Sequence, residues 1–231
     1  MAKKIKVTPR LKNYVVFILD KSGSMTSLKN EVVGGFNQNV EEVKKNNKDK
    51  GMETKVCLVT FSTFADKPIL WLEDVNKIEP LTNENYNPDG STAMFDCIGT
   101  TIDELQRLPD ANDENVSFLI IIISDGEENS SRVYNASRIS ELVTSCEKTN
   151  RWTFAYVGAN QDLKDVSKML NINVMNTLAF AATVDGYSNL TGSMLMATGR
   201  YYGARSAGLT SVSNMFDDSD AVDNSKKNKE K

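Results

Sequence analysis

The feature that most constrains the fold is an unbroken run of six apolar residues, Phe118 to Ile123, four of which are isoleucine. Such a run is typical of a buried strand, because apolar side chains on both sides of a strand must be covered on both faces of its sheet. A second run of the same kind, Tyr14 to Leu19, ends in a polar turn. The chain is therefore expected to fold around a parallel sheet that helices cover on both faces.

Helical and strand patterns alternate along the rest of the chain. Apolar residues at spacings of three and four predict helices over 24–46, 92–108, 134–149, 162–170 and 186–207. Shorter apolar runs predict strands at 14–20, 53–61, 68–75, 116–124, 152–157 and 172–175. Pro68 at the start of one strand, and the short polar turn before it, indicate a hairpin at the sheet edge. The pattern predicts an α/β fold with a doubly wound, Rossmann-like, mostly parallel sheet, one antiparallel edge strand and an extra C-terminal helix.

Composition divides the 231-residue chain into four segments. Residues 1–12 are a basic lead-in, and residues 13–176 carry the alternating pattern of one domain. Residues 177–208 are expected to form a helical extension that packs on this domain. The Gly, Ser, Asp and Lys content of 209–231 predicts a disordered tail.

Histidine is absent from the chain, which removes several kinds of chemistry at once. Catalytic triads that use histidine, histidine-ligated zinc and the ordinary histidine general base are all excluded. The three cysteines, Cys57, Cys97 and Cys146, have no CxxC spacing and are expected to be buried core residues. Any metal must therefore be held by oxygen atoms.

Charge and hydropathy limit the partners and the location. The net charge is −4 and the pI is about 5.1, which disfavours nucleic acid as the main partner. No apolar stretch approaches the roughly 20 residues that a membrane span needs. The basic N-terminus is not followed by the apolar core of a secretory signal, so a cytoplasmic location is expected. The sequence does not indicate an oligomeric state.

Polar side chains gather at three places that the predicted topology brings to one edge of the sheet. Asp20, Ser22 and Ser24 follow the first strand, Thr92 lies where a loop enters a helix, and Asp125 follows the central strand. The carboxyl ends of strands are where open α/β sheets bind their ligands. Carboxylates and hydroxyls suit a hard cation such as Mg²⁺ or Mn²⁺.

Each of these residues also has an ordinary structural interpretation. Asp20, Ser22, Ser24 and Thr92 are all residue types that cap helix N-termini, and Asp125 precedes a glycine, as in a simple turn. Three acidic residues near the cluster each have two interpretations. Asp96, one helical turn beyond Thr92, either orients a loop of the site or is solvated or capping. Glu127 and Glu128 either extend the negative field or are solvated.

The three motifs together resemble the metal-ion-dependent adhesion site (MIDAS) of von Willebrand factor type A (VWA) domains. They are Asp20-Lys21-Ser22-Gly23-Ser24, the threonine in Gly-Ser-Thr-Ala-Met-Phe-Asp, and the aspartate in Ile-Ile-Ser-Asp-Gly-Glu-Glu-Asn. Their order and separations match that family over roughly residues 12–175. The resemblance implies that Asp20, Ser22, Ser24 and Thr92 are metal-site residues, and that Asp125 binds directly or through water. The gross organisation is similar to small stand-alone members from bacteria or bacteriophages.

The function expected from these residues is metal-dependent capture of a protein partner. Hydroxyls are neutral, so the two carboxylates offset the charge of the dication only about once and the site stays electrophilic. A glutamate or aspartate of the partner can then complete the metal's coordination shell. No base stands ready to activate a bound water, so we do not expect an enzyme. One alternative is a structural or scaffold protein in which the metal only stabilises the fold. The other is a metal-dependent phosphohydrolase, although Ser22 stands where haloacid-dehalogenase-type enzymes place a second carboxylate.

Overall fold

The computed structural model describes residues 10–159 and 163–216. Its six strands form one sheet in the order β3-β2-β1-β4-β5-β6. Their bounds are β1 (Lys12–Asp20), β2 (Glu53–Phe61), β3 (Leu70–Asp74), β4 (Val116–Ser124), β5 (Trp152–Ala159) and β6 (Thr177–Phe180). Strand β3 pairs antiparallel with β2, and the other neighbouring pairs are parallel. The predicted fold class, with its antiparallel edge strand, is confirmed.

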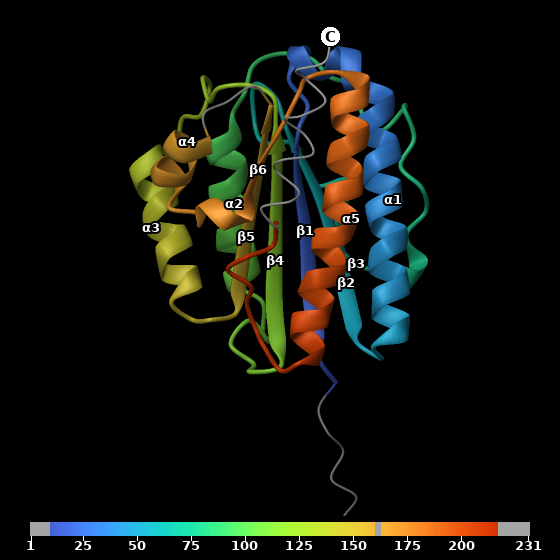
Figure 1. Ribbon diagram of the computed structural model, residues 1–231. Coiled ribbons are helices and arrows are strands. Elements are labelled where there is room, and N and C mark those ends of the chain that lie inside the picture. Colours follow the sequence, from blue (N-terminus) through green and yellow to red (C-terminus); the bar gives the residue numbers. More distant parts are fainter. Residues whose placement is uncertain (1–9, 160–162, 217–231) are drawn as a thin grey trace, which may run out of the picture.

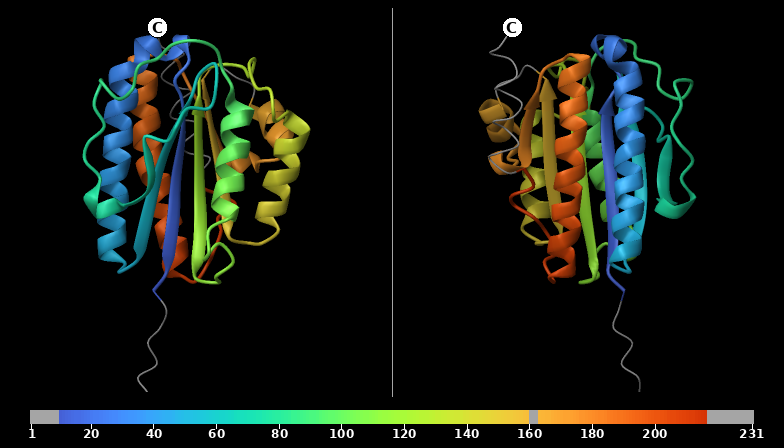
Figure 2. Two further views of the ribbon diagram at one scale, coloured as in Figure 1. Left: turned by 180° about the vertical axis from the view of Figure 1, so that it is seen from behind. Right: turned by 45° about the vertical axis from the view of Figure 1, so that its right-hand side comes forward.

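Helices cover both faces of this sheet (Figures 1 and 2). The α-helices are α1 (Lys29–Asp49), α2 (Met94–Gln106), α3 (Ala136–Glu147), α4 (Leu163–Leu170) and α5 (Val184–Ser206). Three short 3₁₀ helices are η1 (Gly23–Leu28), η2 (Val75–Lys77) and η3 (Val174–Asn176). Helices α1 and α5 lie side by side on one face, and α2, α3 and α4 lie on the other.

The two central strands explain why the apolar runs are continuous. Strands β1 and β4 pair with Tyr14 opposite Phe118 and Leu19 opposite Ile123. Alternate side chains of each strand enter the two different core clusters, because successive residues point to opposite faces of a sheet. Both faces are covered by helices, so every residue of β4 is buried.

The strand order changes direction between β1 and β4. From β1 the chain passes through α1 to β2 on one side, and from β4 it passes through α3 to β5 on the other. Connections that leave in opposite directions open a crevice at the carboxyl ends of these two strands. In Figure 1 this edge is at the top, where η1 follows β1.

The last predicted strand, 172–175, is wrong in position. The side chain of Asn173 accepts a hydrogen bond from the N–H of Met175 and caps η3, which bends the chain at this point. The final strand β6 follows, and it pairs with β5 from Thr177 onward. A short apolar run shows that a strand is near, but the cap residue decides where it begins.

The segment 177–208, expected to be a helical extension packed on the domain, also contains strand β6. Strand β6 extends the sheet, and α5 contributes Leu190, Met194 and Tyr201 to the same core cluster as β1. The C-terminal helical segment is therefore part of the sheet domain, because among the described residues α1 and α5 are the α-helices that cover this face.

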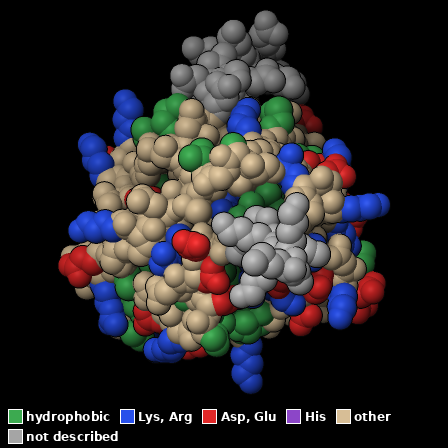
Figure 3. Space-filling view, turned by 90° about the horizontal axis from the view of Figure 1, so that it is seen from below, with side chains coloured by type: hydrophobic (Ala, Val, Ile, Leu, Met, Phe, Trp, Pro, Cys, Tyr) green, Lys and Arg blue, Asp and Glu red, His purple; other side chains and the backbone are tan. Residues whose placement is uncertain are grey.

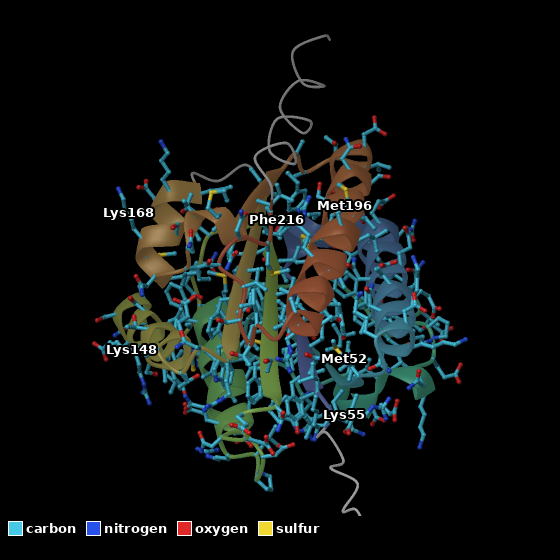
Figure 4. All side chains as sticks on the ribbon, turned by 60° about the horizontal axis from the view of Figure 1, so that its bottom comes forward. Met52, Lys55, Lys148, Lys168, Met196 and Phe216 are labelled. Carbon is cyan, nitrogen blue, oxygen red and sulfur yellow. The ribbon has the colours of Figure 1, made fainter. Side chains whose placement is uncertain are left out.

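Residues 209–216, which the sequence assigns to a disordered tail, instead cross the sheet face beside α5. Ser117 donates a hydrogen bond to the carbonyl of Thr210 (2.7 Å), and Thr153 accepts one from the N–H of Val212 (2.9 Å). Met215 and Phe216 are buried in the core cluster that contains α5, and Figure 4 labels Phe216 there. The rest of the predicted tail, 217–231, and residues 1–9 of the lead-in lie outside the described residues.

Other expectations concern the surface and the cysteines. Cys57, Cys97 and Cys146 are buried free thiols, as predicted. Within residues 10–159 and 163–216, no helix combines the length and apolarity needed to cross a membrane. The face seen from below carries positive and negative side chains interspersed, with hydrophobic side chains in small groups (Figure 3). Where the described residues are visible in this view, this end of the molecule therefore shows neither a single-sign patch nor a broad apolar one.

Candidate metal centre

Asp20, the last residue of β1, joins the ends of the two central strands. Its side chain is fully buried. Oδ1 accepts a hydrogen bond from the N–H of Ser22 (2.7 Å), and Oδ2 accepts one from the hydroxyl of Ser124 (2.5 Å), the last residue of β4. The carboxylate is thus fixed where the carboxyl ends of β1 and β4 meet.

A chain of hydroxyl groups leads from the first loop to the loop after β4. The hydroxyls of Ser22 and Ser24 are 3.0 Å apart. Ser24 then donates a hydrogen bond to Oδ1 of Asp125 (2.7 Å). The hydroxyls of the two serines therefore lie between the two carboxylates. Ser22 and Ser24 are two residues apart, and both side chains face this cluster.

Thr92 completes the cluster beside Gly126. A Cβ atom built on Gly126 would lie 3.3 Å from Oγ1 of Thr92, 3.9 Å from Oδ2 of Asp20 and 4.0 Å from Oγ of Ser24. Oxygens from three separate segments therefore surround the space that this glycine leaves open. All five side chains that the sequence nominates are brought into one cluster, and their role as metal ligands stays a prediction.

The structure tests whether these residues only cap helices or shape a turn. Ser22 is the N-cap of η1 but its side chain makes no cap hydrogen bond, and the N-caps of α1 and α2 are Leu28 and Ala93. Thr92 precedes its helix and points to the cluster. Asp125 accepts its hydrogen bond from Ser24 of a different loop, so it does more than shape a local turn. Helix capping alone does not explain these side chains.

The loop before α2 is fixed to the first motif by several hydrogen bonds. The hydroxyl of Tyr86 donates to the carbonyl of Asp20, and the N–H of Asp89 donates to the carbonyl of Lys21 (2.9 Å). The N–H of Gly23 donates to the carbonyl of Gly90 (3.0 Å). Gly90 has φ of +77°, and a Cβ there would lie 2.4 Å from the hydroxyl oxygen of Thr63, so this position requires glycine. The sequence contains no local pattern that marks Tyr86 for this role.

Glu128 and Asn129 fix the loop after β4 to the start of α2. Glu128 accepts hydrogen bonds from the N–H groups of Phe95, Ser130 and Ser131 and from the hydroxyl of Ser131. Asn129 accepts one from the N–H of Thr92 (3.0 Å) and donates its own N–H to the Thr92 carbonyl (3.1 Å). The interpretation of Glu128 as a solvated residue is therefore wrong, because its carboxylate accepts hydrogen bonds from four donors of this loop and of α2. Glu127 is exposed.

Asp96 orients the same loop from α2. Its carboxylate accepts hydrogen bonds from the N–H groups of Arg132, Val133 and Tyr134, at 2.8 to 2.9 Å. Burial raises the pKa of Asp96, but these hydrogen bonds lower it by more, so that the pKa lies below its ordinary value of 3.8. Of the two readings open for Asp96, loop orientation is the one that the contacts support.

The two carboxylates of the cluster have raised pKa values. Burial raises the pKa of Asp20 above 3.8, and the charge of Asp125 adds to this, while hydrogen bonds from Ser124 and Ser22 oppose it. Burial also raises the pKa of Asp125, against the hydrogen bond from Ser24. The cluster thus holds two carboxylates in surroundings that disfavour negative charge.

The donors of this cluster are all oxygen atoms. In the described part of the chain, no group of three or more His, Cys, Asp and Glu side chains is arranged to hold a metal. The cluster has two carboxylates, and its other candidate donors are hydroxyls. Such a set suits a hard divalent cation with open coordination positions better than a soft or tightly enclosed one.

An open doubly wound sheet with a hydroxyl–carboxylate cluster at its switch point defines a class of ligand-binding α/β domain. The von Willebrand factor type A domain model matches residues 15–191, which is more than half of the chain. The chain therefore belongs to the von Willebrand factor type A family, whose domains serve as protein-interaction modules. No curated protein matches the chain.

Solved structures share this fold at low sequence identity. Proximal thread matrix protein 1 from the mussel byssus is 14% identical with a TM-score of 0.53, over 80% of this chain and 46% of that one. A D319A mutant of the PilB minor pilin from Streptococcus sanguinis is 16% identical with a TM-score of 0.55, over 86% and 64%. A further structure of the byssus protein is described as having a zinc-occupied MIDAS motif, at 16% identity and a TM-score of 0.52, over 80% and 45%. The chain thus spans about half to two thirds of the length of these proteins.

Proposed function

We propose that the chain is a metal-dependent protein-binding module. Asp20, Ser22, Ser24, Thr92 and Asp125 would hold Mg²⁺ or Mn²⁺, with Asp125 bound directly or through water. A glutamate or aspartate side chain of a partner protein would occupy a remaining coordination position. The metal would supply the positive charge that attracts and orients this carboxylate.

The observation that carries this proposal is the convergence of three loops on the space beside Gly126. Donor oxygens of Thr92, Asp20 and Ser24 lie within 3.3 to 4.0 Å of one point. The carboxylates of Asp20 and Asp125 are held there although burial raises the pKa of both, and a divalent cation would offset their charge. The byssus protein, which shares the fold, is described with a zinc-occupied MIDAS motif, and this supports a divalent metal in a fold of this kind.

Binding explains the cluster better than catalysis does. The chain has no histidine, and the carboxylates of Asp20 and Asp125 already accept hydrogen bonds from Ser22, Ser124 and Ser24. A hydrolase would need a base placed to activate a metal-bound water. We therefore propose a non-enzymatic binding module. The net charge of −4 supports a partner other than nucleic acid, and we propose a cytoplasmic location, a bacterial or bacteriophage origin and no membrane partner.

Two measurements on the full chain test this proposal. Isothermal titration with Mg²⁺ and Mn²⁺ should show saturable binding to the wild type and none to Asp20→Ala. Affinity capture from the native host lysate should then retain a protein in Mg²⁺ that is lost in chelator and with Asp20→Ala. Metal binding that raises the melting temperature without a metal-dependent partner would favour the structural role instead. Capture that is unchanged in chelator would exclude the metal from partner binding.

A further inference from the structure

A cavity lies between the β2–β3 hairpin and α2, and none of the five candidate metal ligands lines it. Its volume is about 500 Å³, within the range of small-molecule sites. The walls come from the hairpin and from one side of α2 and are largely apolar. They comprise Val59, Ala65, Asp66, Lys67, Pro68, Trp71, Cys97, Thr100, Thr101 and Glu104.

A β-bulge in the edge strand forms one wall of this cavity. Val56 pairs with Glu73 and Leu58 pairs with Leu70, so the single residue Cys57 opposes both Trp71 and Leu72. Extra residues of this kind bend a strand and redirect its side chains. The bulge is therefore located at Trp71, one of the residues that line the cavity.

The backbone conformation of Leu72 accompanies the bulge. Its φ is +55°, a left-handed value that is uncommon for a bulky side chain, and its N–H donates a hydrogen bond to the sulfur of Cys57 (3.3 Å). In a regular strand Trp71 and Leu72 would point to opposite faces, but here both pack against the α2 side of the sheet. The bulge thus places both side chains on the same side of the sheet, where Trp71 lines the cavity.

Charges at the cavity favour an anion. Asp66 forms an ion pair with Lys21 (3.0 Å), and Glu104 forms one with Arg107 (2.6 Å). Lys67 forms no ion pair within residues 10–159 and 163–216. The acidic groups of the wall are balanced, so Lys67 supplies an uncompensated positive charge next to apolar walls.

We propose that this cavity binds a small aromatic carboxylate. The flat aromatic body would lie against Trp71 and the apolar walls, and the carboxylate would face Lys67. The site uses none of the five residues of the metal centre, so it is independent of the proposed function.

Trp71 provides a direct test, because the chain has only two tryptophans. Titrating 2-naphthoate into the ¹⁵N-labelled full chain in chelator should shift the indole N–H signal of Trp71. The signal of Trp152, which is buried in a stack with Phe118 and Phe154, should not move. Trp152→Phe assigns the two signals. For a probe of this size, saturation is expected at roughly millimolar concentration.

Three comparisons decide the outcome. The neutral analogue 2-naphthamide should bind about three- to fivefold more weakly than 2-naphthoate, and Lys67→Gln should remove that difference. Thr100→Phe, at an exposed position of the cavity wall, should block binding, whereas Ser145→Phe on the exposed face of α3 should not. No saturable shift of Trp71, or undiminished binding to Thr100→Phe, would overturn the site. Equal affinity for the amide would overturn the preference for an anion.

Discussion

The hydroxyl of Ser24 donates a hydrogen bond of 2.7 Å to Oδ1 of Asp125, a residue 101 positions later in the chain. This bond connects the loop after β1 to the loop after β4, at the point where the strand order reverses. Since Ser24 also lies 3.0 Å from the Ser22 hydroxyl, the two carboxylates and the two serines respond together to any change at the site.

Replacing Asp20 by asparagine should lower Mg²⁺ affinity by roughly 100-fold or more, because a neutral amide cannot balance the cation. Asn keeps the shape of the side chain, so far-ultraviolet circular dichroism should be unchanged. Isothermal titration measures the affinity, and Asp165→Asn on the exposed face of α4 controls for the loss of one negative charge. Equal affinities of the two variants would contradict the role of Asp20.

Gly126→Ala should weaken metal binding by about tenfold while the fold is retained. The new methyl group would lie 3.3 Å from Oγ1 of Thr92 and would fill the space among the candidate ligands. Gly192→Ala in α5 has no atom within 4 Å of its methyl group and serves as the matched control. If the Gly126→Ala variant binds Mg²⁺ with the affinity of the wild type, the cation does not occupy this space.

Glu128→Gln should destabilise the loop after β4, whereas Glu127→Gln should have almost no effect. An amide can accept only part of the four hydrogen bonds that the Glu128 carboxylate accepts, and bonds to a charged group contribute about 1.5–3 kcal/mol each. Hydrogen exchange at the N–H groups of Ser130 and Ser131 should accelerate in the Glu128 variant. Protection that is the same in both variants would show that this carboxylate does not hold the loop.

The adjacent glycines of α1 should respond in opposite ways to alanine. A methyl group on Gly35 would lie 2.8 Å from the Thr191 hydroxyl oxygen and 3.0 Å from the Tyr187 ring, so Gly35→Ala should cost about 1–3 kcal/mol. Gly34 has no atom within 4 Å of its methyl position, and Gly34→Ala should stabilise the helix by about 0.5–1 kcal/mol. Urea unfolding of the two variants measures both values. Equal changes would mean that α1 and α5 do not pack as closely as described.

The stabilisation by Mg²⁺ should shrink as the pH is lowered from neutral toward 3.8, the ordinary pKa of an aspartate. Because the folded-state pKa values of Asp20 and Asp125 are raised, their contribution to the stability of the metal-free chain is fully present below the unfolded value of 3.8 and is lost as the pH rises through the folded values. Lowering the pH therefore favours the protonated, metal-free fold over the metal-bound one.

Melting temperatures in Mg²⁺ and in chelator, compared across this range, measure the effect. Asp96 and Asp110 have lowered pKa values, so their contribution is lost as the pH falls below 3.8, equally in both conditions. Their contributions therefore cancel in the difference between the melting temperatures in Mg²⁺ and in chelator. A Mg²⁺ effect that stays constant with pH would show that protons and metal do not compete for these carboxylates.

The central strands could be predicted because their information is local. The isoleucines of β4 require a central strand that is covered on both faces of the sheet. Asp20 and Asp125 mark the ends of β1 and β4, because the sequence changes there from apolar to polar. The start of β6 could not be placed in the same way. There the side chain of Asn173 forms a turn that outweighs the apolar character of the residues around it.

The segment after α5 shows a different limit. Its Gly, Ser and Asp content is that of a tail, yet Met215 and Phe216 are buried and Asn176 accepts a hydrogen bond from the N–H of Met215 (2.8 Å). Whether such a segment is ordered depends on whether a partly covered sheet face lies within its reach. Composition does not contain that information.

The sequence by itself determined the fold class and the five side chains at the carboxyl edge, because strand periodicity and polar strand ends are properties of neighbouring residues. Only the tertiary structure decided that Ser24 meets Asp125, that Tyr86 holds the carbonyl of Asp20, and that Trp71 and Leu72 share one face. These contacts depend on strand order, register and a bulge. Hydrogen bonds between distant segments leave no pattern in either segment, so they exist only once the sheet has brought the loops together.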